Sequence, residues 1–285
     1  MPELPEVETV RRGLNQTTLH QPLQGGEVLL ARTIAYPIAH STGLDDLHGK
    51  QITTWHRRGK YLLAELLNTS TGSSRLAGWL GVHLRMTGQL LWLCRDEPVH
   101  KHTRVRLFFP QRQELRFVDQ RTFGQLWIVP ANMPPEQAIP GLQRLGPEPL
   151  SPDFSVAYLA AQVKGRQRSI KSALLDQTLV AGVGNIYADE ALFLSGIRPY
   201  SPCRALSDDQ VQRLHEAVVT VLQAAIAAGG TTFSNFLSVY GVNGNYSRAA
   251  WVYDRENQPC RVCGTSIQRI KLAGRSAHYC PQCQL

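Results

Sequence analysis

The stretch from residue 260 to residue 283 reads CRVCGTSIQRIKLAGRSAHYCPQC and holds two Cys-x-x-Cys pairs separated by sixteen residues. Each pair brings two thiolates to one side of a tight turn, and four thiolates complete a tetrahedral zinc site. The spacing lies within the range of zinc ribbons. Such a site has no open position, so the sequence predicts one structural Zn²⁺ bound by Cys260, Cys263, Cys280 and Cys283. His278 is a competing ligand, although the two pairs form the simpler set.

The segment between the two pairs predicts a β-hairpin, because polar and apolar residues alternate and then meet a turn at Gly274. Residues 255–285 carry five basic residues and one acidic residue, a local charge of +4. Most of these side chains are expected to be ordinary solvated charges. Arg275, beside the turn glycine, is the one that we expect to bind a phosphate.

The composition is that of a folded, basic protein with 285 residues, 43% hydrophobic residues, a net charge of +8 and a pI near 9.4. This length indicates two or three domains. The charge is compatible with a polyanionic partner and equally with an ordinary basic protein. No apolar run reaches about 18 residues, and the acidic start, Met1–Glu6, is unlike a secretory signal. We therefore expect no membrane partner and an intracellular location, in the cytoplasm or, in a bacterium, at the nucleoid. In that reducing compartment, disulfides are not expected.

Residues 1–130 predict a helix followed by a sheet-forming domain. Pro5 suits a first helical turn, and Val7, Val10 and Leu14 share one face of a helix over residues 5–14. Short runs of strand-forming residues follow, at Glu27–Ala31, Tyr61–Leu67, Gly88–Leu93, Arg104–Phe109, Glu114–Val118 and Gln125–Val129. Several short strands of alternating polarity indicate an antiparallel sandwich or barrel.

The second half of the chain predicts helices. Residues 131–153 are rich in proline and are expected to connect two domains. Helical periodicity then appears at Phe154–Val163, Ser169–Asp176, Ile186–Ser195 and Ser207–Ala228. Ser207 is expected to be the N-cap of the last helix. Asn185 is expected to be the N-cap of the helix that begins at Ile186. Residues 154–248 thus form a helical domain that ends in a loop over 230–248, and residues 249–285 form the zinc module. The fold class is α+β with several domains.

Motifs from both ends and from the middle of the chain occur together in one order. The N-terminal string and the four-cysteine ribbon are highly specific, whereas each middle motif alone is weak. The motifs are Pro2–Thr9, Arg58–Tyr61, His83–Gly88, Asp119–Gly124, Leu175–Gln177, Gly182–Tyr187 and the ribbon. Together they resemble the formamidopyrimidine-DNA glycosylase family over nearly the whole chain.

This resemblance implies a bifunctional DNA glycosylase and AP lyase of base excision repair. Such an enzyme removes oxidised purines, 8-oxoguanine and formamidopyrimidines, through a Schiff base on an N-terminal proline and then cuts the strand by β,δ-elimination. The implied architecture is an N-terminal helix with a β-sandwich, a helix–two-turns–helix domain and a zinc-ribbon hairpin. The implied partner is damaged double-stranded DNA, and the protein is expected to be a monomer.

The resemblance assigns catalysis to Pro2, Glu3, Lys60 and Arg275, with Glu6 as a supporting residue. Removal of Met1 leaves Pro2 with a secondary amine, and an α-amine titrates near about 8, so a useful neutral fraction exists at physiological pH. Glu3 is implied as general acid and base. Glu6 has the alternative interpretation of a charge at a helix start, and Lys60 that of an exposed turn lysine.

The resemblance also implies a set of DNA-binding residues. Met86, Arg121 and Phe123 fill the gap left by the extruded nucleotide, although periodicity alone predicts core packing for Met86 and Phe123. The other members are His83, Asn185 and Lys171. The Gly182–Asn185 turn lacks the context of a dinucleotide fingerprint and instead presents a helix start to a phosphate.

The chain departs from the family pattern at three places. Thr122 stands where the family often has a second arginine, and Arg85 where it frequently has a small residue. Loop 230–248 corresponds to a lesion-capping loop, but residues 233–240 differ from the usual pattern. Two alternatives follow. A sister glycosylase that prefers oxidised pyrimidines is disfavoured by Leu4 and by the intact Met-Arg-Phe set. A non-catalytic zinc-ribbon DNA-binding protein is distinguished by its failure to form a borohydride-trapped adduct.

Overall fold

The computed structural model describes all residues except 38–43, 69–74, 232–237, 242–243, 245 and 247–248. The chain divides into two compact units. Unit 1 comprises Met1–Gln143 and Ser234–Gly244, and unit 2 comprises Arg144–Phe233 and Asn245–Leu285.

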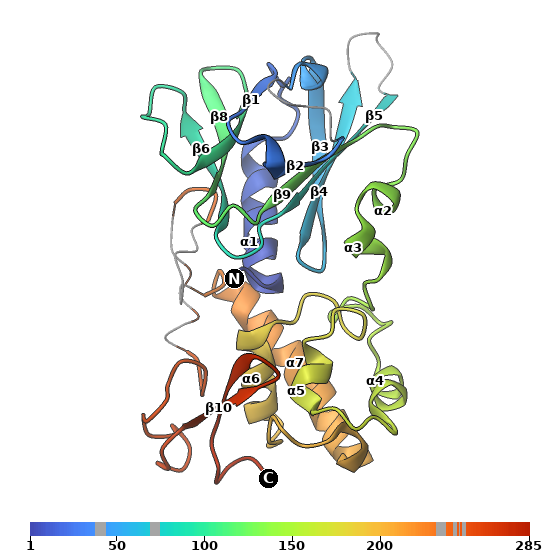
Figure 1. Cartoon of the computed structure of the whole chain (residues 1–285), viewed down its shortest axis with the longest axis vertical. Coiled ribbons are helices and arrows are strands. Elements are labelled where there is room, and N and C mark those ends of the chain that lie inside the picture. Colours follow the sequence, from blue (N-terminus) through green and yellow to red (C-terminus); the bar gives the residue numbers. More distant parts are fainter. Residues whose placement is uncertain (38–43, 69–74, 232–237, 242–243, 245, 247–248) are drawn as a thin grey trace. The chain divides into compact units, whose positions relative to one another are not determined.

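Unit 1 contains two β-sheets, which confirms the predicted sandwich class (Figure 1). In order across the sheet, the five-stranded sheet consists of β2 (Ile34–Tyr36), β9 (Gln125–Val129), β5 (Arg75–His83), β4 (Tyr61–Asn68) and β3 (Lys50–Arg58). The four-stranded sheet consists of β1 (Gly26–Val28), β7 (Thr103–Phe108), β8 (Gln113–Asp119) and β6 (Gly88–Cys94). All neighbours are antiparallel except β2 and β9, which are parallel. Strands β2, β3 and β5 were not predicted from the sequence.

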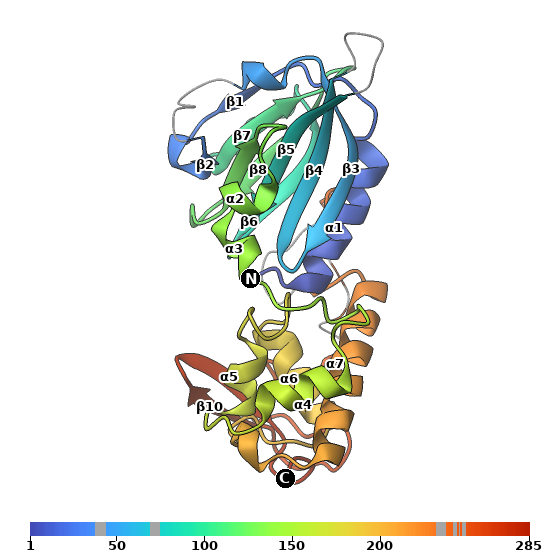
Figure 2. The ribbon, with the colours of Figure 1, turned by 90° about the vertical axis from the view of Figure 1, so that its right-hand side faces the viewer.

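Helix α1 (Leu4–Thr17) belongs to the core of unit 1. Val7, Val10 and Leu14 are fully buried in the same cluster as apolar residues of both sheets. Figure 2 shows α1 running alongside β3. The chain also returns to this core at Val239, whose carbonyl accepts the Trp92 N–H at 3.0 Å. Burial of its apolar face therefore fixes the helix that follows the N-terminal residues.

Four short helices also lie in the described part of unit 1. They are the 3₁₀ helices η1 (Ala31–Thr33) and η2 (Asp45–Leu47), and α2 (Pro135–Ala138) and α3 (Pro140–Gln143). The last two lie within residues 131–153, where the sequence predicts a connector. The division into units falls inside that stretch, after Gln143. Residues 232–237, 242–243, 245 and 247–248 of the expected capping loop lie outside the described residues.

Unit 2 contains the four predicted helices and the predicted hairpin. The helices are α4 (Val156–Val163), α5 (Ile170–Leu174), α6 (Asn185–Leu194) and α7 (Asp208–Ala227), with a 3₁₀ turn, η3 (Cys203–Ala205), before α7. The hydroxyl of Ser207 caps α7 as predicted, because it accepts the Gln210 N–H at 3.3 Å. The prediction for Asn185 is wrong: Gly184 is the N-cap of α6, and Asn185 is the first helical residue.

The hairpin of unit 2 pairs β10 (Gln268–Leu272) with β11 (Arg275–Tyr279), and Ala273 and Gly274 form its turn. A small cluster of Phe193, Val252, Ile267 and two of the cysteines lies beneath it. None of the helices in the described part of the chain has both the length and the apolar character that crossing a bilayer requires.

Candidate functional site

The N-terminal residues of unit 1 are buried. Pro2 is buried, and the exposed fractions of Glu3 and Glu6 are 2% and 1%. A Glu6 carboxylate oxygen accepts the backbone N–H of Glu3 at 2.8 Å. This bond satisfies a backbone donor ahead of α1, so Glu6 does serve the helix start. In doing so it also fixes the peptide that joins Pro2 to Glu3.

The α-amine at the chain start lies among charges of both signs. Burial lowers the pKa of the Met1 amine below its ordinary value, while Glu3 and Glu6 act to raise it. Lys60 and Arg121 add smaller effects that lower this pKa. The structure therefore brings four sequence-predicted residues near the amino terminus. The balance favours a neutral amine, the form that can act as a nucleophile.

Lys60 is not an exposed turn lysine. It lies in the two-residue turn between β3 and β4, where Arg58 pairs with Tyr61, and it is only 7% exposed. Gly59 before it has a φ of 55°. A left-handed residue is what such a tight hairpin turn requires, so glycine at this point allows the lysine to turn inward.

His83, at the end of β5, is buried and neutral. It pairs across the sheet with Tyr61, and the two rings meet edge to face at 4.5 Å. Its Nδ1 accepts the Arg85 N–H at 3.0 Å. Burial, Arg85 and Lys60 together lower the pKa of His83 to about 3. His83 can therefore offer an uncharged Nε2–H donor at every physiological pH.

Two turns of unit 1 are joined by one hydrogen-bonded pair. The Thr87 hydroxyl donates to one carboxylate oxygen of Asp119 and accepts the Arg121 N–H at 3.0 Å. The other Asp119 oxygen accepts the Gly124 N–H at 2.7 Å. Asp119 is only 1% exposed. It thus ties the turn that carries Met86 to the turn that carries Arg121 and Phe123.

Phe123 is not a core residue. Its side chain is 53% exposed, and the guanidinium of Arg121 lies over its ring at 5.0 Å. Phe123 therefore presents its ring at the surface of a turn that is held by a buried aspartate. Met86 is half-buried and lies in the neighbouring turn. The core-packing interpretation therefore fails for Phe123.

In unit 2, the structure overturns the prediction for Lys171. Its side chain is 1% exposed, its Nζ lies 2.6 Å from Asp189 Oδ1, and it donates to the Ser276 carbonyl. A cation that is buried and paired in this way adds no charge to a DNA-binding surface. The side chain instead joins α5 to α6 and to the hairpin.

Asn185 and Arg275 lie at this same junction. The Asn185 side-chain amide donates to Ser276 Oγ at 3.3 Å, and its carbonyl oxygen has no hydrogen-bond partner in the described part of unit 2. Arg275, next to Ser276, is exposed. Asp189 also accepts the backbone N–H of His278 at 3.0 Å. These bonds place Arg275 beside the start of α6, the helix end whose dipole favours an anion.

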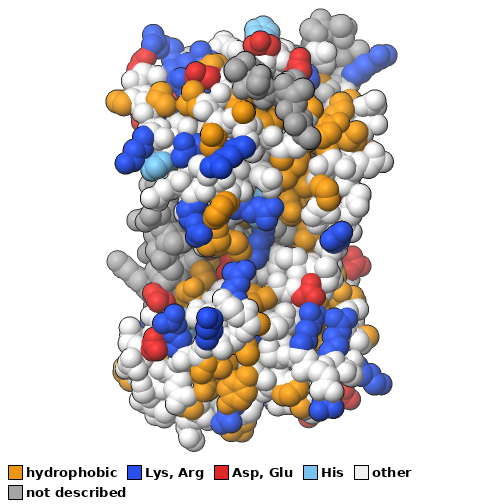
Figure 3. Space-filling view, in the orientation of Figure 1, with side chains coloured by type: hydrophobic (Ala, Val, Ile, Leu, Met, Phe, Trp, Pro, Cys, Tyr) orange, Lys and Arg blue, Asp and Glu red, His pale blue; other side chains and the backbone are white. Residues whose placement is uncertain are grey.

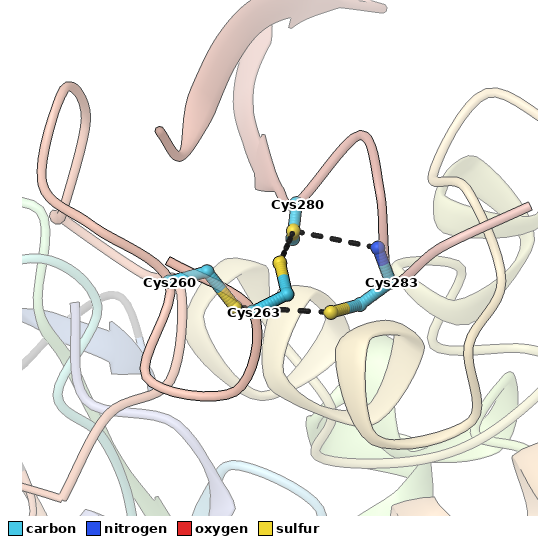
Figure 4. A group of neighbouring side chains, drawn as sticks. All are labelled: Cys260, Cys263, Cys280 and Cys283. Carbon is cyan, nitrogen blue, oxygen red and sulfur yellow. Dashed lines mark hydrogen bonds between the residues drawn. The ribbon is translucent and has the colours of Figure 1, made fainter. Parts of the chain in front are cut away.

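The four predicted cysteines form a metal site (Figure 4). Their sulfur atoms all lie within 4.8 Å of one another. The Cys263–Cys280 and Cys260–Cys283 sulfur pairs are 3.5 and 3.8 Å apart. Zn–S bonds of about 2.3 Å in a tetrahedron require sulfur separations of about 3.8 Å, so the cluster fits one Zn²⁺. His278 is not among the side chains that gather at this site, and its Nδ1 contacts Asp189 at 3.2 Å.

Sequence reasoning did not identify several residues that hold the predicted functional side chains in place. Thr87 and Asp119 lie in the motifs quoted above, but only the fold reveals that they join two turns. Asp189 is the acid that holds Lys171, eighteen residues earlier in the chain. On the face drawn in Figure 3, Lys and Arg side chains occur over both units. Charge alone therefore does not mark the site.

Comparison with known proteins completes the picture. The N-terminal domain model of formamidopyrimidine-DNA glycosylase matches residues 1–126, and its H2TH domain model matches residues 145–236. A zinc finger found in Fpg and in isoleucyl-tRNA synthetase matches residues 257–285. The chain belongs to the formamidopyrimidine-DNA glycosylase family. The predicted family, the fold class and the single structural zinc site are thereby confirmed.

Relatives in the family match over the full chain. The formamidopyrimidine-DNA glycosylase of Nostoc punctiforme is 63% identical over 284 residues, covering 100% of this chain and 96% of the relative. That of Acaryochloris marina is 61% identical, covering 100% and 99%. The structure of a Lactococcus lactis Fpg variant in complex with DNA containing Fapy-dG matches with a TM-score of 0.88 and 34% identity, covering 99% of each chain. The Thermus thermophilus protein matches with a TM-score of 0.83 and 39% identity, covering 99% and 98%.

Proposed function

We propose that this chain removes oxidised purines from duplex DNA and then cuts the sugar–phosphate backbone, with the amine of Pro2 as nucleophile after removal of Met1. The relatives with 60% identity or more bear the name formamidopyrimidine-DNA glycosylase, and the Lactococcus lactis neighbours are complexes with damaged DNA. The observation that carries the residue assignment is the buried amino terminus beside Glu3, Glu6 and Lys60, where the pKa of an α-amine is lowered.

The chemistry follows from a secondary amine. The nitrogen lone pair attacks C1′ of the damaged nucleotide, the bond from C1′ to the base breaks, and the base departs with its electron pair and a proton. Opening of the C1′–O4′ bond, with protonation of O4′, leaves an iminium between Pro2 and C1′. This cation acidifies the C2′ hydrogen. Its loss expels the 3′ phosphate, and a second elimination expels the 5′ phosphate.

Glu3 is the proposed general acid and base, since its carboxylate is buried directly next to the amine. Glu6 is a positioning residue, because its oxygen holds the Glu3 N–H. Lys60 lies inward in its turn and carries a charge suited to the lesion phosphate. Its charge also disfavours protonation of the amine.

The two joined turns of unit 1 supply the residues that replace the extruded nucleotide. Phe123 stacks between bases, Met86 acts as a flexible wedge, and Arg121 bonds the partner base. Unit 2 contributes Asn185 and Arg275 as phosphate ligands. The zinc ion supplies no step of the reaction, and its four thiolate ligands hold the hairpin that bears Arg275. The proposed working form is a monomer on damaged double-stranded DNA, inside the cell with the chromosome.

A preference for oxidised pyrimidines is the competing lesion specificity. One neighbour at 35% identity is a complex of wild-type Lactococcus lactis Fpg with DNA that contains an oxidised pyrimidine, so the fold itself admits such DNA. Single-turnover excision from otherwise identical duplexes, one with 8-oxoguanine and one with an oxidised pyrimidine, separates the two. We expect faster release of the purine. Faster release of the pyrimidine would assign this chain to the sister activity.

The nucleophile is tested by Pro2→Gly, with Pro22→Gly as a matched control at an exposed proline of the same unit. We expect Pro2→Gly to slow borohydride trapping on abasic duplex by roughly 10²-fold or more, the scale of a positioned catalytic group. Binding to an uncleavable abasic analogue should be retained, and the control should match wild type. An equal loss of binding and trapping would make Pro2 a structural residue.

A further inference from the structure

Four arginines of unit 1 meet at one turn, residues 119–125. Arg32, in η1, donates to Thr122 Oγ1, and Arg85 donates to the Gln125 side-chain oxygen at 3.0 Å. Arg104, in β7, donates through Nε to the Asp119 carbonyl at 2.8 Å. The fourth, Arg121, belongs to the turn itself. The parallel pairing of β2 with β9 is what brings η1 to this place, since Ile34 lies opposite Leu126.

The acceptors that hold these guanidinium groups are neutral. Within the described residues, Arg32, Arg85, Arg104 and Arg121 form no ion pair with an acidic side chain. Asp119 is the acid of the turn, and its two oxygens are occupied by Thr87 and Gly124. One carboxylate thus faces four guanidinium groups, and the positive charge at the turn is only partly offset locally.

Six other arginines of unit 1 behave differently, because each of them binds a carboxylate. Arg11, Arg12 and Arg57 bind Glu8, Arg106 binds Glu27 and Glu114, Arg116 binds Glu114, and Arg112 binds Asp96. In these arginines, the positive charge is offset by the carboxylate to which the side chain is bound. At the 119–125 turn, four guanidinium groups are gathered around the single carboxylate of Asp119, and this excess of positive charge costs free energy unless an anion binds.

We propose that Arg32, Arg85 and Arg104 form a cationic collar, defined by these three residues, that binds the phosphates of duplex DNA around the turn bearing Arg121 and Phe123. Arg32 and Arg85 are exposed and use one N–H each within the protein, so most of their five donors remain for phosphate oxygens. Arg104 is half-buried and contributes mainly charge. The collar rests on the proposed function, in which Met86, Arg121 and Phe123 fill the gap left by the extruded nucleotide. It adds contacts with the phosphates of the DNA strands on either side of that gap.

The collar predicts a specific change in salt dependence. Each phosphate that a cation neutralises contributes about 0.9 to the slope of log K against log salt. Arg32→Gln retains a donor for Thr122 but loses the charge, so this slope should become shallower by about 0.9 on an undamaged duplex. In the variant with Gln at all three collar positions, the slope of log K against log salt should become shallower by roughly 2.7. Arg32→Lys, which keeps the charge, should keep the wild-type slope.

Arg112→Gln is the matched control, because Arg112 is an exposed arginine already paired with Asp96. Its slope should equal that of wild type. If Arg32→Gln and the triple variant share the slope of this control, the collar is wrong even though wild-type enzyme cleaves lesion DNA. Single-turnover cleavage at low salt by the Arg112→Gln control, with enzyme in excess, should match the wild-type rate. If wild type itself neither traps nor cleaves, the proposed function fails instead.

Discussion

In unit 1, a hydrophobic core fixes the residues around the amino terminus, whereas in unit 2 four thiolates and a buried ion pair fix the hairpin that carries Arg275. Helix α1 lies in a core shared by two sheets, and its buried apolar face, together with the bond between Glu6 and the Glu3 N–H, determines where Glu3 and Glu6 lie. The hairpin rests on a much smaller cluster. A short segment without a sizeable core requires other constraints, and here the constraints are the metal and the Lys171–Asp189 pair. The two units should therefore respond differently to the same kinds of disturbance.

Loss of zinc should have the largest effect, and it should be confined to unit 2. We expect Cys263→Ser to lose bound zinc and DNA affinity together, with affinity reduced more than tenfold, because the hairpin folds only around the metal. Zinc content and binding to an abasic-analogue duplex measure this effect. Cys94→Ser, at a cysteine outside the cluster, should alter neither. Retention of both zinc and affinity in the first variant would refute the four-cysteine site.

Removal of the buried ion pair between Lys171 and Asp189 should have the second largest effect. Lys171→Met leaves the Asp189 carboxylate buried without its cation, which costs about 3–5 kcal/mol of unfolding free energy. Arg168→Met is the control, because Arg168 and Asp176 form a partly exposed pair in the same unit and should cost under about 1 kcal/mol. Urea unfolding of zinc-loaded protein compares the two. Equal costs would show that Lys171 is not a structural residue of this junction.

A fall in pH should lower the unfolding free energy of unit 1 through protonation of Glu8. Burial acts to raise the pKa of Glu8, but hydrogen bonds from Arg11 and Arg12 and the charge of Arg57 outweigh it and lower the pKa to about 2. A lowered carboxylate pKa stabilises the fold above the unfolded value of 4.5, and this stabilisation is lost as pH falls toward 2. After allowance for solvent screening, we expect Glu8 to contribute about 1–2 kcal/mol. Glu8→Gln should flatten the unfolding free energy between pH 5 and pH 2, and an unchanged pH profile would contradict this role.

The smallest expected effect is the absence of a titration of the His83 imidazole near neutral pH. Because burial and two neighbouring cations lower its pKa to about 3, its imidazole should show no titration between pH 5 and pH 8 in an NMR experiment. An unperturbed histidine would pass its midpoint near about 6.5 in that window. Observation of such a midpoint for His83 would mean that the buried environment of β5 is absent in solution.

How much the sequence could predict depends on the range of the interactions. Local signals were sufficient for the ribbon, for the Ser207 cap and for most strands. Strand β5 was missed because Gly78 and Gly81 interrupt its pattern. The fold shows why glycine is needed, since a Cβ on Gly78 would lie 2.2 Å from the Val129 carbonyl oxygen. Strand β3 was missed because a register shift between Ile52 and Thr54 breaks its alternation.

Side-chain roles were harder to predict than the elements. Lys171 looked like a surface charge because its partner, Asp189, lies on another helix. Arg32 likewise donates to Thr122 Oγ1 from ninety residues away, a bond that the sequence does not indicate. Both contacts join side chains that only the fold brings near, and no periodicity in a single sequence encodes such pairs.

The central claim is that the mature N-terminal proline becomes bonded to deoxyribose. Mass spectrometry of the complex trapped with borohydride on abasic duplex tests it most directly, because the digest reports both the processing of Met1 and the residue that carries the sugar. We predict a chain that begins at Pro2, with the reduced adduct on its nitrogen. An adduct on Lys60 or another lysine, or full cleavage by a chain that retains Met1, would contradict the account.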